Sequence, residues 1–149
     1  TNKYQMIREM TDLLSNISAE INFSMTFFIP KNSNSLVDGL CKGKGFQYKI
    51  ENISNEKVAL ELPKFHYGFL LRGNHILNKV ASPVKFYEYI STGLRVISTK
   101  YVGDYSDLIQ TNNLGVIVDI DQDQSSKVIQ DINAYVYNQE VFKSFLNEK

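Results

Sequence analysis

The sequence predicts an α/β fold with a doubly wound, mainly parallel sheet and helices on both faces. Segments with the 3.6-residue period of amphipathic helices alternate with five short runs rich in β-branched and aromatic residues. Most of these runs are apolar on both faces, which is typical of strands that helices cover on both sides. In such sheets ligands bind beyond the carboxyl ends of the strands. Functional residues are therefore expected just after Pro30, Asn52, Arg72 and Thr99.

The first half of the chain begins with apolar residues at helical spacing and polar residues between them. Tyr4, Ile7, Leu14 and Ile17 belong to this stripe, which predicts an amphipathic helix. Further along, an apolar run ended by proline predicts a strand, and glycines or a proline end the next helices. The expected elements are a helix over 4–19, a strand over 23–30, a helix over 35–43, a strand over 46–52 and a helix over 55–62.

The second half continues the alternation of strand and helix. β-branched and aromatic runs predict three strands, and segments with helical spacing predict the helices between them. No repeat or linker interrupts the chain, so a single domain is expected over 1–149. The expected order is a strand over 66–72, a polar loop over 73–81, a helix over 82–92, a strand over 95–99, a helix over 105–113, a strand over 114–120, a helix over 125–139 and a short helical tail.

Composition excludes some classes of function. The 149 residues carry 16 basic and 16 acidic side chains, so no global positive field attracts nucleic acid. The apolar runs are shorter than the roughly 20 residues that span a bilayer, so no direct membrane insertion is expected. The single cysteine, Cys41, is interpreted as a small buried hydrophobe near a helix end. A cytoplasmic location fits these features.

The candidate functional residues are concentrated in SPVKFYEYISTGLRVIST, from Ser82 to Thr99. Ser82 suits a helix N-cap, and a proline suits the first helical position. Free N–H groups of the first turn and the helix dipole attract anions, and Lys85 adds a full charge, so a phosphate fits there. Glu88 lies on the same edge and can accept hydrogen bonds from a diol. The alternative is that Lys85 and Glu88 only form an exposed ion pair.

The opposite side of the same helix has the pattern of a packing face. Phe86, Tyr89, Ile90 and Gly93 recur at i, i+3, i+4 and i+7, so this side is expected to lie against the sheet. Gly93 suits the left-handed position that ends a helix. Lys85 and Glu88 are then left as the functional candidates.

The segments HYGFLLR and SPVKFYEYISTGLRVIST together resemble the nucleotide-sugar-binding half of retaining GT-B glycosyltransferases, the large group 1 or family 4. The resemblance covers most of the chain and implies a Rossmann-like domain, with the donor's diphosphate at the helix start near Val84 and Lys85. It also implies that Glu88 grips the ribose hydroxyls. Lys85 would stabilise the leaving diphosphate electrostatically, so we assign it the catalytic role.

Other site residues follow from the same resemblance. The donor base would lie after FQYKIEN, near Asn52, Ile53 and Ser54. Lys3 would be a remnant of the family's basic phosphate-binding pair. Arg72 is a candidate because of its position instead: it ends a strand on the expected binding edge, and two interpretations stay open, a contact with phosphate or sugar and a cap of the strand into solvent.

The chain departs from the family pattern in two places. Val80 stands where the first glutamate of the family's E-x7-E motif is expected, and the family's opening strand and its acceptor-binding domain are not in this sequence. The chain is therefore interpreted as part of a two-domain enzyme of polysaccharide biosynthesis. The nucleotide-sugar donor is its substrate, and the other domain would hold an acceptor glycan or lipid-linked sugar at the inner face of the membrane.

Neither a cofactor nor a metal is expected. No His, Cys or carboxylate residues cluster at ligand spacing, and His66 and His75 fall on different elements, where each is interpreted as structural or exposed. Asp104 follows a strand on the binding edge and is interpreted as an exposed turn or helix-start residue.

Three alternatives remain open. A GT-B nucleotide-sugar epimerase would share donor binding without transfer. A non-catalytic α/β module such as a receiver domain needs acidic residues after its strands, whereas FFIPKN and FLLRGN end in basic and amide residues. Ser82 and Lys85 match the S-x-x-K motif of penicillin-recognising enzymes, but no S-D-N or K-T-G accompanies it.

Overall fold

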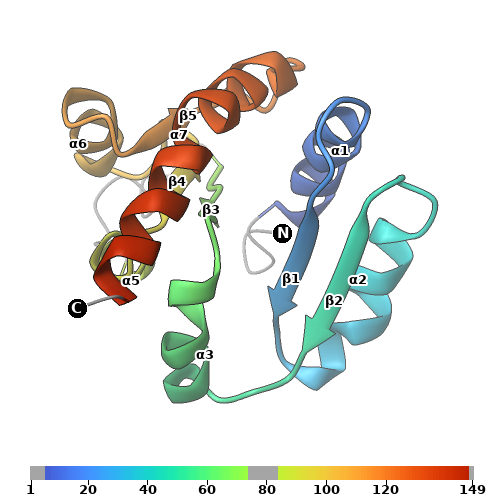
Figure 1. Cartoon of the computed structure of the whole chain (residues 1–149). Helices are drawn as coiled ribbons and strands as arrows, with labels where there is room; N and C mark the ends of the chain where they lie inside the picture. The colour runs from blue at the N-terminus through green and yellow to red at the C-terminus, as the bar shows by residue number, and fades with distance from the viewer. Residues whose placement is uncertain (1–5, 74–83, 148–149) are drawn as a thin grey trace.

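The computed structural model describes residues 6–73 and 84–147. Helices and strands alternate along the chain, as the sequence predicts (Figure 1). The expectations about Lys3, His75, Val80 and Ser82 concern residues outside this described part. The main elements are α1 (Ile7–Ser18), β1 (Ser24–Phe28), α2 (Asn34–Cys41), β2 (Gln47–Glu51), α3 (Asn55–Glu61), β3 (Tyr67–Leu70), α5 (Val84–Ser91), β4 (Arg95–Ser98), α6 (Tyr105–Thr111), β5 (Gly115–Ile117) and α7 (Ser125–Asn147).

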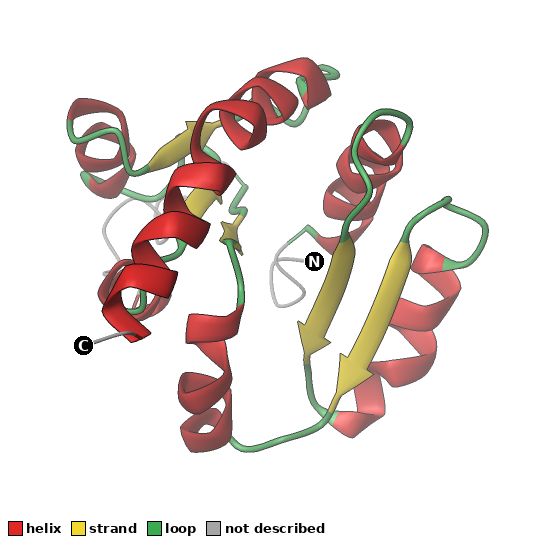
Figure 2. Ribbon diagram, in the orientation of Figure 1, coloured by secondary structure: helices red, strands yellow, loops and turns green. Residues whose placement is uncertain are grey.

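The described strands form two parallel sheets instead of one. β1 pairs with β2, so that Ser24 lies opposite Gln47. β4 lies between β3 and β5, and Tyr67 of β3 lies opposite Arg95. No ladder joins β1 to β3 among these residues, so the expected single sheet is divided into a two-stranded and a three-stranded part. Figure 2 shows the two groups of strands in yellow. The arrangement is compatible with a Rossmann-like fold.

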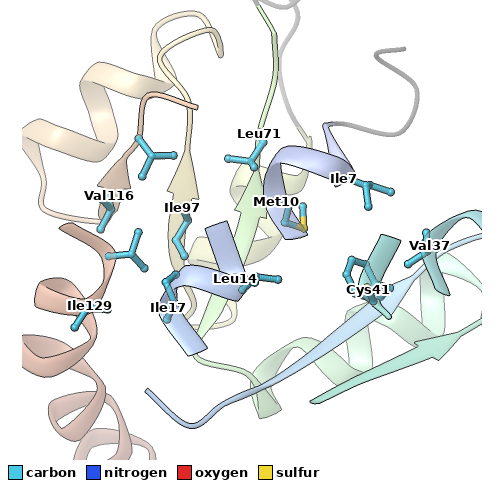
Figure 3. Close-up of a cluster of buried hydrophobic side chains, with 13 residues drawn as sticks. Ile7, Met10, Leu14, Ile17, Val37, Cys41, Leu71, Ile97, Val116 and Ile129 are labelled. Carbon is cyan, nitrogen blue, oxygen red and sulfur yellow. The ribbon is translucent and has the colours of Figure 1, made fainter. Parts of the chain in front are cut away.

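Helix α1 packs against both sheets. Its buried face is the predicted stripe, and Ile7, Met10, Leu14 and Ile17 all lie in one hydrophobic core (Figure 3). The same core also contains side chains from α2, from α7 and from both sheets. Its other buried members are Phe27, Val37, Cys41, Leu71, Ile97, Val116, Val118, Val128 and Ile129. A single core therefore holds the two sheets together.

The opposite face of the three-stranded sheet carries a second, smaller core. Leu70 and Val96 of the strands pack there with Phe86 of α5 and Ile109 of α6. The two-stranded sheet is different, because the side chains of β2 alternate between the large core and solvent. Tyr48 and Ile50 pack toward the core, whereas Gln47 and Lys49 are exposed. This alternation agrees with the alternating strand that the sequence predicts over 46–52.

The C-terminal segment is one long helix. The sequence predicts a helix over 125–139 followed by a separate short tail, whereas α7 runs from Ser125 to Asn147 without a break. Even this helix lacks the apolar length that would be needed to cross a bilayer, and the same holds for the other helices in the described part of the chain.

Candidate anion-binding site

The carboxyl ends of β3 and β4 are fastened together by a buried threonine. The Thr99 hydroxyl donates to the carbonyl oxygen of Arg72 at 2.6 Å and accepts the Arg72 backbone N–H at 2.9 Å. Thr99 is only 1% exposed. Ser98, the residue before it, donates its hydroxyl to the Leu70 carbonyl oxygen at 3.0 Å. These bonds fix the backbone of Arg72 at the edge where the sequence predicts a ligand.

The Arg72 side chain has an unusual environment. Its Nε is buried and has no hydrogen-bond partner in the described structure. Leaving a buried N–H unpaired costs about 1–3 kcal/mol, and the cost is higher for a charged group. Such groups are rare in folded proteins and call for an explanation. An anion bound beside Arg72 would satisfy this N–H.

Helix α5 is held tightly on β3, next to this edge. Phe86 is buried, and the Tyr89 hydroxyl donates to the Phe69 carbonyl oxygen at 3.2 Å. Gly68 makes this approach possible, because a Cβ there would lie 2.5 Å from the Tyr89 ring. Burial, followed by the charge of Glu88, raises the pKa of Tyr89 to about 12, so its hydroxyl remains a donor. The predicted packing face of α5 is confirmed.

The end of α5 also follows the prediction. Gly93 has a φ of 85°, which only glycine adopts readily. The Leu94 N–H bonds back to the Tyr89 carbonyl oxygen at 3.0 Å, and the Gly93 N–H bonds to the Ile90 carbonyl oxygen at 3.2 Å, which are the two bonds of a Schellman cap.

Lys85 lies in the first turn of α5 and shares its surroundings with Arg72. The Lys85 side chain reaches solvent, yet the surrounding protein displaces enough water to lower the pKa of its ammonium. The Arg72 guanidinium lowers this pKa further, while Glu88 acts in the opposite direction. Two cations from different elements, the end of β3 and the start of α5, thus repel each other at this edge.

Glu88 lies one turn beyond Lys85 and is exposed. The two charged groups form no ion pair with each other in the described structure, although their spacing permits one. The alternative explanation of this pair as a surface salt bridge is therefore not supported. Val84, at the start of the helix, is 68% exposed.

The turn after β2, where the base was expected, has its side chains occupied in the fold. Asn52 and Asn34 exchange hydrogen bonds of 3.1 and 2.8 Å through their amides, and Asn52 also donates to the Ile29 carbonyl oxygen at 2.9 Å. Ser54 caps α3 by accepting the Lys57 N–H. Ile53 is half-buried. These residues follow the two-stranded sheet, whereas Arg72 and Lys85 belong to the three-stranded sheet and its helix.

The remaining predicted candidates have structural explanations. Asp104 is exposed and precedes α6 without a side-chain capping bond, in agreement with an exposed helix-start residue. His66 is half-buried, and its carbonyl oxygen accepts the Arg95 N–H at 3.0 Å. Over residues 6–73 and 84–147, no three side chains of His, Cys, Asp or Glu gather closely enough to bind a metal ion.

A separate cavity of about 270 Å³ lies between α1 and the turn from β5 to α7. Five carboxylate residues line it, namely Glu9, Asp12, Asp119, Asp121 and Asp123, and no lining residue is basic. Like charges repel, so this cavity is unsuited to a phosphate. The positive edge formed by Arg72 and Lys85 is the better anion site.

At the opposite ends of the same strands, sequence reasoning missed a network around Asp131 of α7. The carboxylate accepts two bonds from Arg95, at 2.9 and 2.8 Å, and one from the Tyr67 hydroxyl at 2.6 Å. The Arg95 guanidinium also lies 3.9 Å from the centre of the Tyr135 ring. Burial and then the bond to Asp131 raise the pKa of Tyr67. Every charge in this network has a partner.

Comparison with known proteins adds no assignment, because no family model, curated protein or solved structure matches this chain.

Proposed function

We propose that this chain is the donor-binding domain of a retaining GT-B glycosyltransferase, with a doubly wound sheet, and that Arg72 and Lys85 bind the diphosphate of its nucleotide-sugar donor. One observation carries the proposal: the buried, unpaired Nε of Arg72 lies beside a second cation whose pKa is lowered. An anion would relieve both the unpaired donor and the repulsion between the two charges. The sequence resemblance supplies the class of anion.

In this mechanism the chain's own residues act by electrostatics. The negative charge on the leaving diphosphate increases as its bond to the sugar breaks, and Arg72 and Lys85 stabilise that charge. Guanidinium groups bind phosphate through paired N–H donors, and a lysine adds a mobile point charge. Glu88, further along α5, accepts hydrogen bonds from the ribose hydroxyls. The acceptor, a glycan or lipid-linked sugar, binds a second domain at the inner face of the membrane.

The test is calorimetric titration of the chain with UDP, GDP, their sugars and inorganic pyrophosphate. We expect Arg72→Ala and Lys85→Ala each to weaken binding of all these ligands at least about tenfold, because each removes a charge-assisted contact. Glu88→Ala should weaken binding of the nucleotides but not of pyrophosphate, which has no ribose.

Lys57→Ala is the matched control, because Lys57 is an exposed lysine on α3. It should bind every ligand as the unchanged chain does. If Arg72→Ala and Lys85→Ala both bind the nucleotides as tightly as the unchanged chain does, the proposed site is wrong.

A further inference from the structure

Another cation lies opposite Arg72 at the carboxyl edge of the three-stranded sheet. Leu70 of β3 lies opposite Ser98 of β4. The same register, continued by two residues, places Lys100 opposite Arg72. The strands still lie side by side at this point, because the Thr99 hydroxyl bonds both the N–H and the C=O of Arg72. Neighbouring strands are about 4.8 Å apart, so the backbones of Arg72 and Lys100 are close neighbours.

Arg72, Lys85 and Lys100 share one face of the sheet. Leu70 and Val96 pack into the small core under α5 and α6. Alternate residues of a strand lie on the same face, so Arg72 and Lys100 continue this face beyond the strand ends. Lys85 lies in the first turn of α5, which covers the same face, and its charge interacts with that of Arg72. Three cations therefore gather where α5 begins.

The Lys100 ammonium lies over an aromatic ring and keeps its hydrogen-bond donors available. Its Nζ is 5.3 Å from the centre of the Tyr101 ring, which is within the range of a cation–π contact. Lys100 is exposed, and no carboxylate of residues 6–73 and 84–147 pairs with it. An ammonium has three N–H donors, so Lys100 can bind an oxyanion without leaving the ring. Several other lysines do pair with carboxylates, namely Lys42, Lys44, Lys49 and Lys64.

The number of cations limits which kind of donor fits this edge. The diphosphate of a nucleotide sugar carries one negative charge on each phosphate, and Arg72 and Lys85 match these two charges. A neutral hexose offers no charge to Lys100. A hexuronate, in which a carboxylate replaces the hydroxymethyl group, places a third negative charge on the sugar next to the diphosphate. Because neighbouring cations repel each other, an edge with three of them favours a ligand with three anionic groups.

We propose that the donor is a nucleoside-diphosphate hexuronate and that Lys100 determines this specificity by binding the carboxylate of the sugar. The inference rests on the proposed function, since it takes the diphosphate to lie at Arg72 and Lys85. The sugar carboxylate and the diphosphate are separated by about the width of one sugar ring, which is similar to the spacing of neighbouring strands. The Tyr101 ring positions the Lys100 ammonium at this distance from Arg72.

The test compares donors that differ only in the carboxylate. Three pairs are titrated calorimetrically into the chain: UDP-glucose and UDP-glucuronate, UDP-galactose and UDP-galacturonate, and GDP-mannose and GDP-mannuronate. In at least one pair the uronate should bind at least about fivefold more tightly than the neutral sugar, because a charge-assisted hydrogen bond is stronger than a neutral one. Equal affinities within every pair would overturn the proposal.

Variants of Lys100 assign the preference to this side chain. Lys100→Met should remove the preference within the pair and leave the affinity for the nucleoside diphosphate unchanged, because that ligand has no sugar carboxylate. Lys100→Arg keeps the charge and should keep the preference. Lys57→Met is the matched control, since it removes an exposed lysine on α3. A preference that survives Lys100→Met would overturn the proposal, and so would an equal loss of affinity for the nucleoside diphosphate and the uronate.

Failure of this inference and failure of the proposed function give different results. If the proposed function is wrong, Arg72→Ala and Lys85→Ala leave the affinity for the nucleoside diphosphate unchanged. If only the role of Lys100 is wrong, both of these variants still weaken that affinity, whereas the uronate and the neutral sugar bind equally well.

Discussion

At the amino ends of β3 and β4, Arg95 is bound by Asp131 and stacked on Tyr135, and its side chain is only 12% exposed. At the carboxyl ends of the same strands, Arg72 has a buried Nε without a partner, and the nearby Lys85 adds repulsion. The two clusters lie on neighbouring strands and use the same residue type. Only their surroundings differ.

This difference separates structural charges from candidate functional ones. A buried arginine that serves the fold is neutralised and hydrogen-bonded within the fold, because an unpaired buried charge is destabilising. A cation kept for a ligand must leave its donors available until the ligand arrives. The amino-end cluster fits the first description, and the carboxyl-end cluster fits the second.

Asp131→Ala should have the largest effect on stability. It leaves the Arg95 guanidinium and the Tyr67 hydroxyl without their shared acceptor, and breaking a buried ion pair in this way costs about 3–5 kcal/mol. Urea unfolding measures the loss. Glu61→Ala, which removes an exposed ion pair with Lys64, is the control and should change stability by less than about 1 kcal/mol. If both variants lose a similar free energy of unfolding, the Asp131 network is no more stabilising than an exposed ion pair, and the prediction is wrong.

Gly68→Ala should affect both clusters through the strand that connects them. A Cβ on Gly68 would collide with the Tyr89 ring, and overpacking of this kind costs about 1–3 kcal/mol. The displaced α5 carries Lys85, so pyrophosphate affinity should fall as well. The double variant Gly68→Ala/Tyr89→Leu should recover part of the stability. Thermal unfolding in which both variants lose the same amount would show that the collision is not the cause.

Thr99→Val tests how the carboxyl ends are held. Valine has a similar shape but cannot bond the N–H and C=O of Arg72, so stability should fall by about 1–2 kcal/mol. Pyrophosphate binding should weaken because Arg72 loses its fixed position. Thr99→Ser keeps the hydroxyl and should bind as well as the unchanged chain; if it binds as weakly as Thr99→Val, the hydroxyl is not what positions Arg72.

Lys85→Met should have the smallest effect on stability, and of the opposite sign. The pKa of Lys85 is lowered in the fold, so its charged form is disfavoured at neutral pH, and removing it should raise stability by less than about 1 kcal/mol after solvent screening. Above the lowered pKa the native state releases this proton before the unfolded state does. The unchanged chain should therefore gain stability relative to Lys85→Met as the pH rises toward about 10.4, the ordinary pKa of lysine. Denaturant unfolding at pH 7 and pH 10 measures the two differences, and a destabilised variant at pH 7 would contradict this account.

Local patterns in the sequence were enough to predict most helices and strands, the buried stripe of α1, and both the packing face and the end of α5. The stripe of α1 and the packing face and glycine end of α5 depend on residues within a few turns of each other, and both agree with the structure. The alternation of Tyr48 and Ile50 with exposed Gln47 and Lys49 is also local, and the alternating strand expected over 46–52 is confirmed.

Long-range pairing was not predictable in the same way. The division into two sheets depends on which edges meet, and no local pattern records that. Asp131 reads as an ordinary charge on a helix until the fold brings it to Arg95, 36 residues away. Thr99 reads as the last residue of a strand, and only the alignment of β3 with β4 shows that it holds Arg72.

The shared core under α1 also provides a natural reporter of local opening. Cys41, on α2, is 1% exposed, and burial followed by the charge of Asp38 raises its thiol pKa to about 11. At neutral pH this thiol reacts only when α2 separates from α1, since reagents need an accessible thiolate. The rate of Cys41 labelling therefore measures how often α2 and the two-stranded sheet separate from α1 without global unfolding of the chain. If α2 separates from α1 only when the whole chain unfolds, the Cys41 thiol should be labelled at the rate set by the free energy of global unfolding.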